Sequence, residues 1–167
     1  MLVDSIEISV NKNDAIKHLF RKTPLISKIE QFNKKIENIH LEYVEFKVLK
    51  YEIIYMRKNK GTFRNDDIKN EIIMIVNTYN GNSQSVDFIP NTVKRYIARS
   101  RIKKSNINEE YIIEKVKNEI INHFQTKFKG NYIEKQSIKS IKILETSSIY
   151  KPYWIGDYSG KEVFLPA

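Results

Sequence analysis

The chain reads LEYVEFKVLKYEIIY over residues 41–55, and the apolar pattern of this stretch is typical of a sheet. Its first part alternates Val44, Phe46 and Val48 with charged residues, which is the period of two of a strand with one buried face. From Leu49 onward, the apolar residues occupy the other phase. Because a shift of one residue turns every side chain to the opposite face, we expect a bulge or bend near Val48 and Leu49.

Further strands are expected on the carboxyl side of this stretch. Residues 72–76 (IIMIV) are apolar in both phases, which is typical of a central strand. Asn80 and Gly81 form a strong hairpin signal, so the chain should return along residues 85–88. A last hairpin is expected from residues 150–158 and 163–165, with its turn at Ser159 and Gly160.

Apolar residues at helical spacing predict four helices. Three of them cover residues 13–20, 26–39 and 91–97, and the first can begin at the N-cap residue Asn13. The fourth is amphipathic and has six apolar residues on one face: Ile112, Ile113, Val116, Ile120, Ile121 and Phe124. We expect this face to pack against a sheet that contains Ile73, Ile75 and Ile143.

The order of these elements predicts an α+β fold with helices packed on a mainly antiparallel sheet. We expect residues 1–167 to form a single compact domain. The order of helix and then meander occurs twice, so a pseudo-duplication with halves 1–90 and 91–167 is the alternative organisation.

A helix followed by three strands, the last two joined through a glycine turn, resembles the PepSY-type repeat, a small module linked to peptidase regulation. Residues 13–15 (NDA) and Leu19 match the start of the helix of that module, and residues 157–163 (DYSGKEV) match its last turn. The Asp and Gly that follow its final strand have no counterpart here. The resemblance therefore implies an order of elements, and no activity is carried over from it.

Composition excludes several classes of site. The chain has no cysteine, which excludes disulfides, thiolate metal sites and a Cys nucleophile. His18, His40 and His123 lack the spacing of a metal site, and no glycine-rich phosphate loop or nucleophile elbow occurs, so we expect no metal and no cofactor. The first residues lack the regions of a signal peptide, and no apolar run is long enough to span a bilayer, so we expect a cytoplasmic protein without a membrane span.

Residues 94–104 (KRYIARSRIKK) carry much of the formal charge of +9. The candidate nucleic-acid-binding residues in this segment are Lys94, Arg95, Tyr96, Arg99, Arg101, Lys103 and Lys104. Clustered Lys and Arg side chains neutralise phosphates and release counterions, and a tyrosine ring can stack on a base. The alternative is that the segment is a solvated linker between two halves of the chain.

Residues 150–158 (YKPYWIGDY) concentrate aromatic side chains. Tyr150, Tyr153 and Tyr158 are candidates for a protein interface, since aromatic residues with a polar tip are favoured in binding surfaces. For that role we expect Tyr150 and Tyr153 to be partly exposed and Trp154 to be mostly buried. The alternative is that the whole cluster is ordinary strand packing.

Three functions remain open at this level. The first is a non-catalytic interaction module that binds another protein, of unknown identity, through a sheet face or edge. The alternative is a protein that binds DNA or RNA through residues 94–104. A small enzyme with an unrecognised site is the third, and the absence of catalytic motifs speaks against it.

Overall fold

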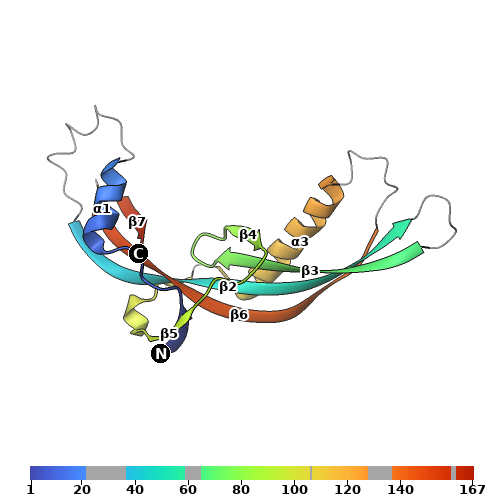
Figure 1. Cartoon of the computed structure of the whole chain (residues 1–167), viewed down its shortest axis with the longest axis horizontal. Helices are drawn as coiled ribbons and strands as arrows, with labels where there is room; N and C mark the ends of the chain where they lie inside the picture. Colours follow the sequence, from blue (N-terminus) through green and yellow to red (C-terminus); the bar gives the residue numbers. More distant parts are fainter. Residues whose placement is uncertain (22–36, 59–64, 106, 128–136, 159–160) are drawn as a thin grey trace. The chain divides into compact units, whose positions relative to one another are not determined.

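The computed structural model describes residues 1–21, 37–58, 65–105, 107–127, 137–158 and 161–167. These residues form seven strands, two α-helices and one 3-10 turn. In chain order they are β1 (Leu2–Ser5), α1 (Lys12–Arg21), β2 (Glu37–Lys58), β3 (Asn65–Asn77), β4 (Ser83–Val86), β5 (Val93–Tyr96), η1 (Arg99–Arg101), α3 (Glu109–Lys127), β6 (Ser137–Tyr158) and β7 (Lys161–Pro166). Figure 1 shows these elements along the chain.

The predicted fold class, helices packed on a mainly antiparallel sheet, is wrong. Most described residues belong to one mixed sheet whose strands are hydrogen-bonded in the order β4-β3-β2-β6-β1-β5, with β7 paired to β6. β1 and β6 are parallel, whereas β3 pairs with both β2 and β4 in the antiparallel sense. The main reason is the length of two strands. β2 and β6 have 22 residues each and cover segments for which the sequence predicts shorter elements.

Two of the predicted helices differ from the structure. The segment predicted as a helix over residues 91–97 contains β5, because residues 93–96 pair with β1 in antiparallel register from Ser5–Val93 to Leu2–Tyr96. A spacing of three and four over so few residues does not separate a helix from a short strand. Most of the helix predicted over residues 26–39 lies outside the described residues, and residues 37–39 belong to β2.

The bulge predicted near Val48 and Leu49 does not occur in the pairing of β2 with β3. The pairing of β2 with β3 runs without interruption from Phe46–Asn77 to Lys58–Asn65. The change of apolar phase has another cause: Val44 and Val48 are buried on one face of β2, and Leu49, Tyr51 and Ile53 are buried on the other. The pattern therefore marks a change of the covered face rather than a change of register.

The chain divides into two compact units that alternate along the sequence. The first unit contains residues 1–45, 91–104 and 149–167, and the second contains residues 46–90 and 105–148. Both β2 and β6 continue from one unit into the other. The single domain and the pseudo-duplication stay predictions.

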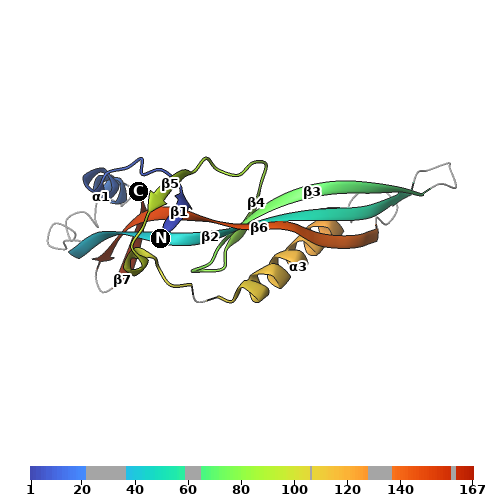
Figure 2. The same cartoon turned by 90° about the horizontal axis from the view of Figure 1, so that it is seen from below.

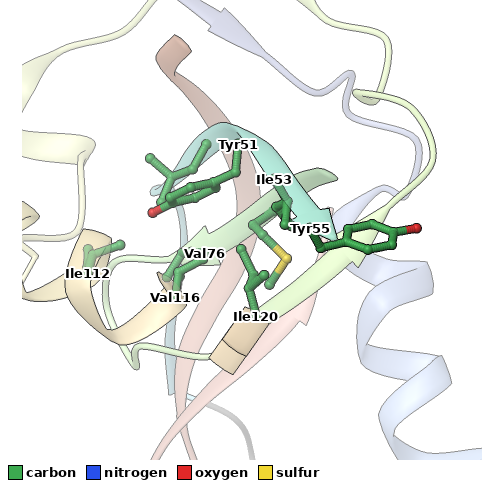
Figure 3. Close-up of a cluster of buried hydrophobic side chains, with 9 residues drawn as sticks. Tyr51, Ile53, Tyr55, Val76, Ile112, Val116 and Ile120 are labelled. Atoms are coloured by element: carbon green, nitrogen blue, oxygen red, sulfur yellow. The ribbon is translucent and has the colours of Figure 1, made fainter. Parts of the chain in front are cut away.

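The core of the second unit lies between α3 and one face of the sheet. Figure 3 shows Ile112, Val116 and Ile120 of α3 facing side chains of β2 and β3. The strand residues in this cluster are Leu49, Tyr51, Ile53, Tyr55, Met74 and Val76. Ile143 packs at its border as expected, but β3 contributes Met74 and Val76 instead of the predicted Ile73 and Ile75, so its phase is the opposite one.

Two contacts fix α3 in this place. The Asn108 side-chain carbonyl oxygen accepts a hydrogen bond of 3.0 Å from the backbone N–H of Glu110, which caps the start of the helix. The buried Tyr51 hydroxyl donates to the backbone carbonyl of Ile113 at 3.0 Å. Burial raises the pKa of the Tyr51 phenol to about 12, so this hydroxyl stays protonated and remains a donor.

The first unit has its own smaller core, which contains Val3, Tyr43, Ile97 and Tyr150. It is closed at one end by reciprocal bonds between the chain start and the residue after β5. The amino group of Met1 donates to the Ile97 carbonyl at 2.8 Å, and the Ile97 N–H donates to the Met1 carbonyl at 2.9 Å. These bonds continue the β1–β5 ladder by one residue pair.

Candidate functional site

β3 is paired on both sides along only part of its length. Residues 73–76 lie between β2 and β4, whereas for residues 65–72 β2 is the sole strand partner among the described residues. Figure 2 shows β3 continuing far beyond the end of β4. We call residues 65–72 of β3 the open edge. β4 stops at Val86 because the chain bends there, and Phe88 is left 76 % exposed.

The hydrogen-bond pattern shows which backbone groups the open edge presents. The Asn77 N–H donates to the Asn82 carbonyl at 2.8 Å, so Asn77 is directed toward the β4 side. Backbone direction alternates along an antiparallel strand, so every second residue has its N–H and C=O on that same side. The residues of the open edge that follow this pattern are Glu71, Lys69, Asp67 and, at the end of the strand, Asn65.

A hollow of about 660 Å³ lies at the step where β4 ends and the open edge begins. Its apolar lining comes from Ile72, Ile73 and Met74 of β3, Val86 of β4, and Ile120 and Phe124 of α3. Its charged and polar lining consists of Lys50, Glu71, Ser83, Gln84, Ser85, Asp87, Glu119 and His123. Three of these side chains are acids and one is a lysine, which makes the hollow locally acidic in a basic protein.

Polar contacts hold α3 against the β3–β4 turn and shape one wall of the hollow. The Ser83 hydroxyl donates to the Glu119 carboxylate, and the Lys115 ammonium lies 3.6 Å from the same carboxylate. Lys115 also donates to the Gly81 carbonyl at 2.5 Å. Gly81 has a φ of 74°, a left-handed conformation that glycine adopts without strain. The hairpin signal at Asn80 and Gly81 is thus confirmed, and the turn also positions the helix.

The face of β3 that points away from α3 is covered by ion pairs. They join Lys50 to Glu71 at 2.8 Å, Lys139 to Asp67 at 2.6 Å, and Lys69 to Glu52. The hydrogen bond from Lys50 lowers the pKa of the Glu71 carboxyl, and the bond to Glu52 raises the pKa of Lys69. The side chains of Asp67, Lys69 and Glu71 are therefore each paired with an opposite charge on another strand.

The aromatic cluster is only partly as predicted. Tyr150 is 8 % exposed and packs in the first unit's core, so its expected exposure is wrong. Tyr153 is half-buried, with its ring 5.9 Å from the ring of Phe164, and burial raises the pKa of its phenol. Trp154 is neither fully buried nor exposed, and its Nε1 donates to the Val10 carbonyl at 2.9 Å. The side chain of Tyr158 lies outside the described residues.

The expected hairpin of β6 and β7 is confirmed, and it explains why these aromatics pack inward. The strands pair in antiparallel register from Tyr153–Pro166 to Tyr158–Lys161. Its turn, at Ser159 and Gly160, lies outside the described residues. Tyr150 pairs with Ser5 of β1 and residues 153–158 pair with β7, so one side of the aromatic segment is occupied by strands.

The basic segment divides into two groups. Lys94 and Lys103 are held by acids of the first unit. Lys94 lies 2.8 Å from Asp4, and Lys103 contacts Glu162 and lies 3.9 Å from Glu42. Lys103 also lies 5.6 Å above the ring of Phe164. Both lysines therefore contribute to the packing of the first unit.

The remaining members of the segment are more available. Tyr96, Arg99, Arg101 and Lys104 are exposed, and no ion pair joins them to another described residue. Arg95 is half-buried, and its Nε has no hydrogen-bond partner within the described ranges. Fewer residues of this segment are therefore exposed and without an ion pair than the sequence suggests.

Sequence reasoning missed the open edge and the hollow. Residues 58–67 are rich in polar side chains, which is typical of a loop, but residues 65–67 belong to β3. The signal that could have located the strand is the alternation of Ile68 and Ile72 with charged residues, which is the period of two of a strand. The position of the hollow depends on where β4 ends, and no pattern in the sequence indicates that point.

The described ranges contain no group of three or more His, Asp or Glu side chains arranged to hold a metal ion. No described helix is both long enough and apolar enough to cross a membrane. Comparison of the chain with known proteins found no matching family model, no similar curated protein and no similar solved structure. The functional argument therefore depends on the site geometry alone.

Proposed function

We propose that this protein is an interaction module that binds an extended segment of another protein by strand addition at the open edge of β3. The observation that carries the proposal is the position of the open edge directly beside a hollow of about 660 Å³. Backbone bonds to Asp67, Lys69 and Glu71 would supply affinity, and the hollow would supply specificity for side chains. In binding by strand addition, main-chain hydrogen bonds generally supply the affinity and side-chain pockets supply the specificity.

The register of β3 defines which side chains of the incoming segment meet the hollow. Residues placed opposite Asn70 and Ile72 point to the face of α3, where Ile120 and Phe124 form the apolar wall. Residues placed opposite Glu71, Lys69 and Asp67 point to the face of the ion pairs. The best ligand therefore alternates apolar residues with charges that complement these three side chains.

The hollow adds a preference for positive charge. Glu71 and Glu119 already have basic neighbours, but Asp87 has no ion pair with any described residue and lies in the lining. A lysine or arginine of the incoming segment opposite Glu71 lies close to this acidic side of the hollow. We therefore propose a segment with a basic residue opposite Glu71, between the two apolar residues that lie opposite Asn70 and Ile72.

A direct test uses a capped, fluorescein-labelled peptide of sequence Val-Lys-Val-Glu-Val-Lys-Val. Its charges complement Glu71, Lys69 and Asp67, and because the sequence is a palindrome it fits in either strand direction. We expect saturable binding by fluorescence anisotropy and much weaker binding of the charge-reversed peptide Val-Glu-Val-Lys-Val-Glu-Val. Equal affinity for the two peptides would contradict the proposed register.

Amide hydrogen exchange tests the position of binding. Bound peptide should slow exchange at Asp67, Lys69 and Glu71, whose N–H groups are directed to the open edge. The amides of Ile68 and Asn70 already face β2, so their exchange should change little. Protection that appears elsewhere and spares the three edge amides would place the peptide at another site.

The substitution Lys69→Pro removes one outward N–H and keeps the pairing of β3 with β2, since proline is tolerated at an edge position whose N–H faces solvent. We expect at least about tenfold weaker peptide binding, because one backbone hydrogen bond to the peptide is lost and the proline ring conflicts sterically with the peptide strand. Lys69→Ala is the matched control because it loses the same ion pair with Glu52 and keeps the N–H. If both variants bind the peptide equally well, strand addition at β3 is excluded.

A further inference from the structure

The exposed part of the basic segment is held in a fixed conformation by buried contacts. Ile97, which follows β5, is 3 % exposed in the first unit's core, and Ile102 bridges to Tyr43. The Lys103 N–H donates to the Tyr43 carbonyl at 2.9 Å. Between these anchors the 3-10 turn η1 has no buried residue. The segment from Tyr96 to Lys104 is therefore presented to solvent from a stable base and is not a loose linker.

The charge on this surface is uncompensated. Arg99, Arg101 and Lys104 are exposed and make no ion pair with the residues that the structure describes. The sequence has no acid between Asp87 and Glu109. The nearby acids Asp4, Glu42 and Glu162 are already engaged by Lys94 and Lys103. Three exposed cations within the segment from Arg99 to Lys104, none in an ion pair with a described residue, attract a polyanion.

Tyr96 adds a feature that a purely electrostatic surface does not need. Its side chain is 83 % exposed and stands three residues before Arg99. Among the exposed large hydrophobic side chains of the described residues, Tyr96 has the highest exposed fraction. Base stacking on exposed aromatic rings beside basic residues is the common mode by which proteins hold single-stranded nucleic acid.

We infer that Tyr96, Arg99, Arg101 and Lys104 form a site for single-stranded nucleic acid. The arginines and the lysine contact successive phosphates, and Tyr96 stacks on an unpaired base. Bases within a duplex are already stacked on each other and do not offer a face to Tyr96, which favours a single strand. An acidic protein strand on β5 is less favoured, because β5 has four residues and carries Lys94 and Arg95, features that disfavour strand pairing.

The test is fluorescence anisotropy of the full chain with a labelled oligothymidylate of about 20 nucleotides, from ~50 to ~300 mM salt. Replacing Arg99 and Arg101 together by Ala should reduce the slope of log affinity against log salt by about 1.4, or about 0.7 for each lost phosphate contact. The matched control is Lys12→Ala with Lys161→Ala, which removes two exposed charges elsewhere in the first unit. If the control lowers the slope as much, the effect is due to net charge and the site is refuted.

Tyr96→Ala separates nucleic acid from a general polyanion. It should weaken oligothymidylate binding by about 5- to 150-fold, the range for loss of one base–aromatic stack, and leave the salt slope unchanged. Binding of inorganic polyphosphate, which has no bases, should not change. The inference is overturned if Tyr96→Ala weakens the binding of both ligands equally, or if it weakens neither. It is also overturned if the protein binds poly-glutamate more tightly than the oligonucleotide. Tyr96 is outside the core, so an unchanged melting temperature verifies that the variant is folded.

Discussion

His40 uses both of its ring nitrogens as donors. Nδ1 lies 2.6 Å from the carbonyl oxygen of Asn38, and Nε2 lies 2.8 Å from a carboxylate oxygen of Glu42. Neither oxygen can donate, so both bonds are satisfied only when the imidazole is protonated. The bond to Asn38 and then the bond to Glu42 raise the pKa of His40. Asn38 has a φ of 52°, a conformation that asparagine adopts more readily than most residues.

This geometry predicts a dependence of stability on pH. The folded-state pKa of His40 is above its unfolded value, so the stabilisation is fully present below the unfolded value and is lost as pH rises through the folded one. His40→Gln should therefore destabilise the protein at about pH 5.5 and much less at about pH 8.5. Urea denaturation of both proteins at the two pH values measures this. A difference that stays constant with pH would show that His40 is not protonated in the folded state.

Single residues also show where sequence reasoning reaches its limit. The sequence shows that residues 94–104 are basic. It does not show which of these side chains make ion pairs. Lys94 and Lys103 meet Asp4 and Glu162, residues that are 90 and 59 positions away in the chain. Tyr150 is buried for the same reason, since its neighbours Val3, Tyr43 and Ile97 come from three distant segments. Local patterns carry no information on such contacts.

Elements differ in how far they can be predicted. The apolar stripe from Ile112 to Phe124 extends over several turns and identifies α3, because only a helix brings such spacing to one face. β5 has four residues, and its state is determined by pairing with β1 rather than by its own pattern. The extent of β3 was underestimated because the charges near Asp66 and Asp67 suggest a loop, although neighbouring strands balance them. Tertiary pairing overrides local preference in both strands.

The packing of α3 gives a stability prediction for the second unit. Ile120 is 3 % exposed and contacts the cluster that contains Ile53 and Met74. Ile120→Ala should lower the free energy of unfolding by about 2–5 kcal/mol, from lost apolar burial and a residual cavity. Ile121→Ala is the control. Ile121 is the next residue of the helix and is half-buried, so its replacement should lower the free energy of unfolding by less. Chemical denaturation of the two variants gives the comparison, and equal losses would show that the core is not where we place it.

At the scale of the whole molecule, β2 and β6 are the features that connect the chain. Each has 22 residues, and each contributes one part to the first unit and another to the second. A strand that loses its partners in one unit also loses the backbone ladder that continues into the other. The open edge in the second unit and the basic surface in the first both pair with β2, through β3 and through Ile102 respectively.

Shared strands predict one cooperative unfolding transition for the full chain. Trp154 is the only tryptophan and belongs to the first unit, where its Nε1 bonds to the Val10 carbonyl, so its fluorescence reports that unit alone. Far-UV circular dichroism reports all strands and α3. The two signals should have the same midpoint in urea, and Ile120→Ala, which lies in the second unit, should shift both by the same amount. If the Trp154 transition keeps its parental midpoint while the dichroism shifts, the units unfold independently and the continuous strands do not couple them.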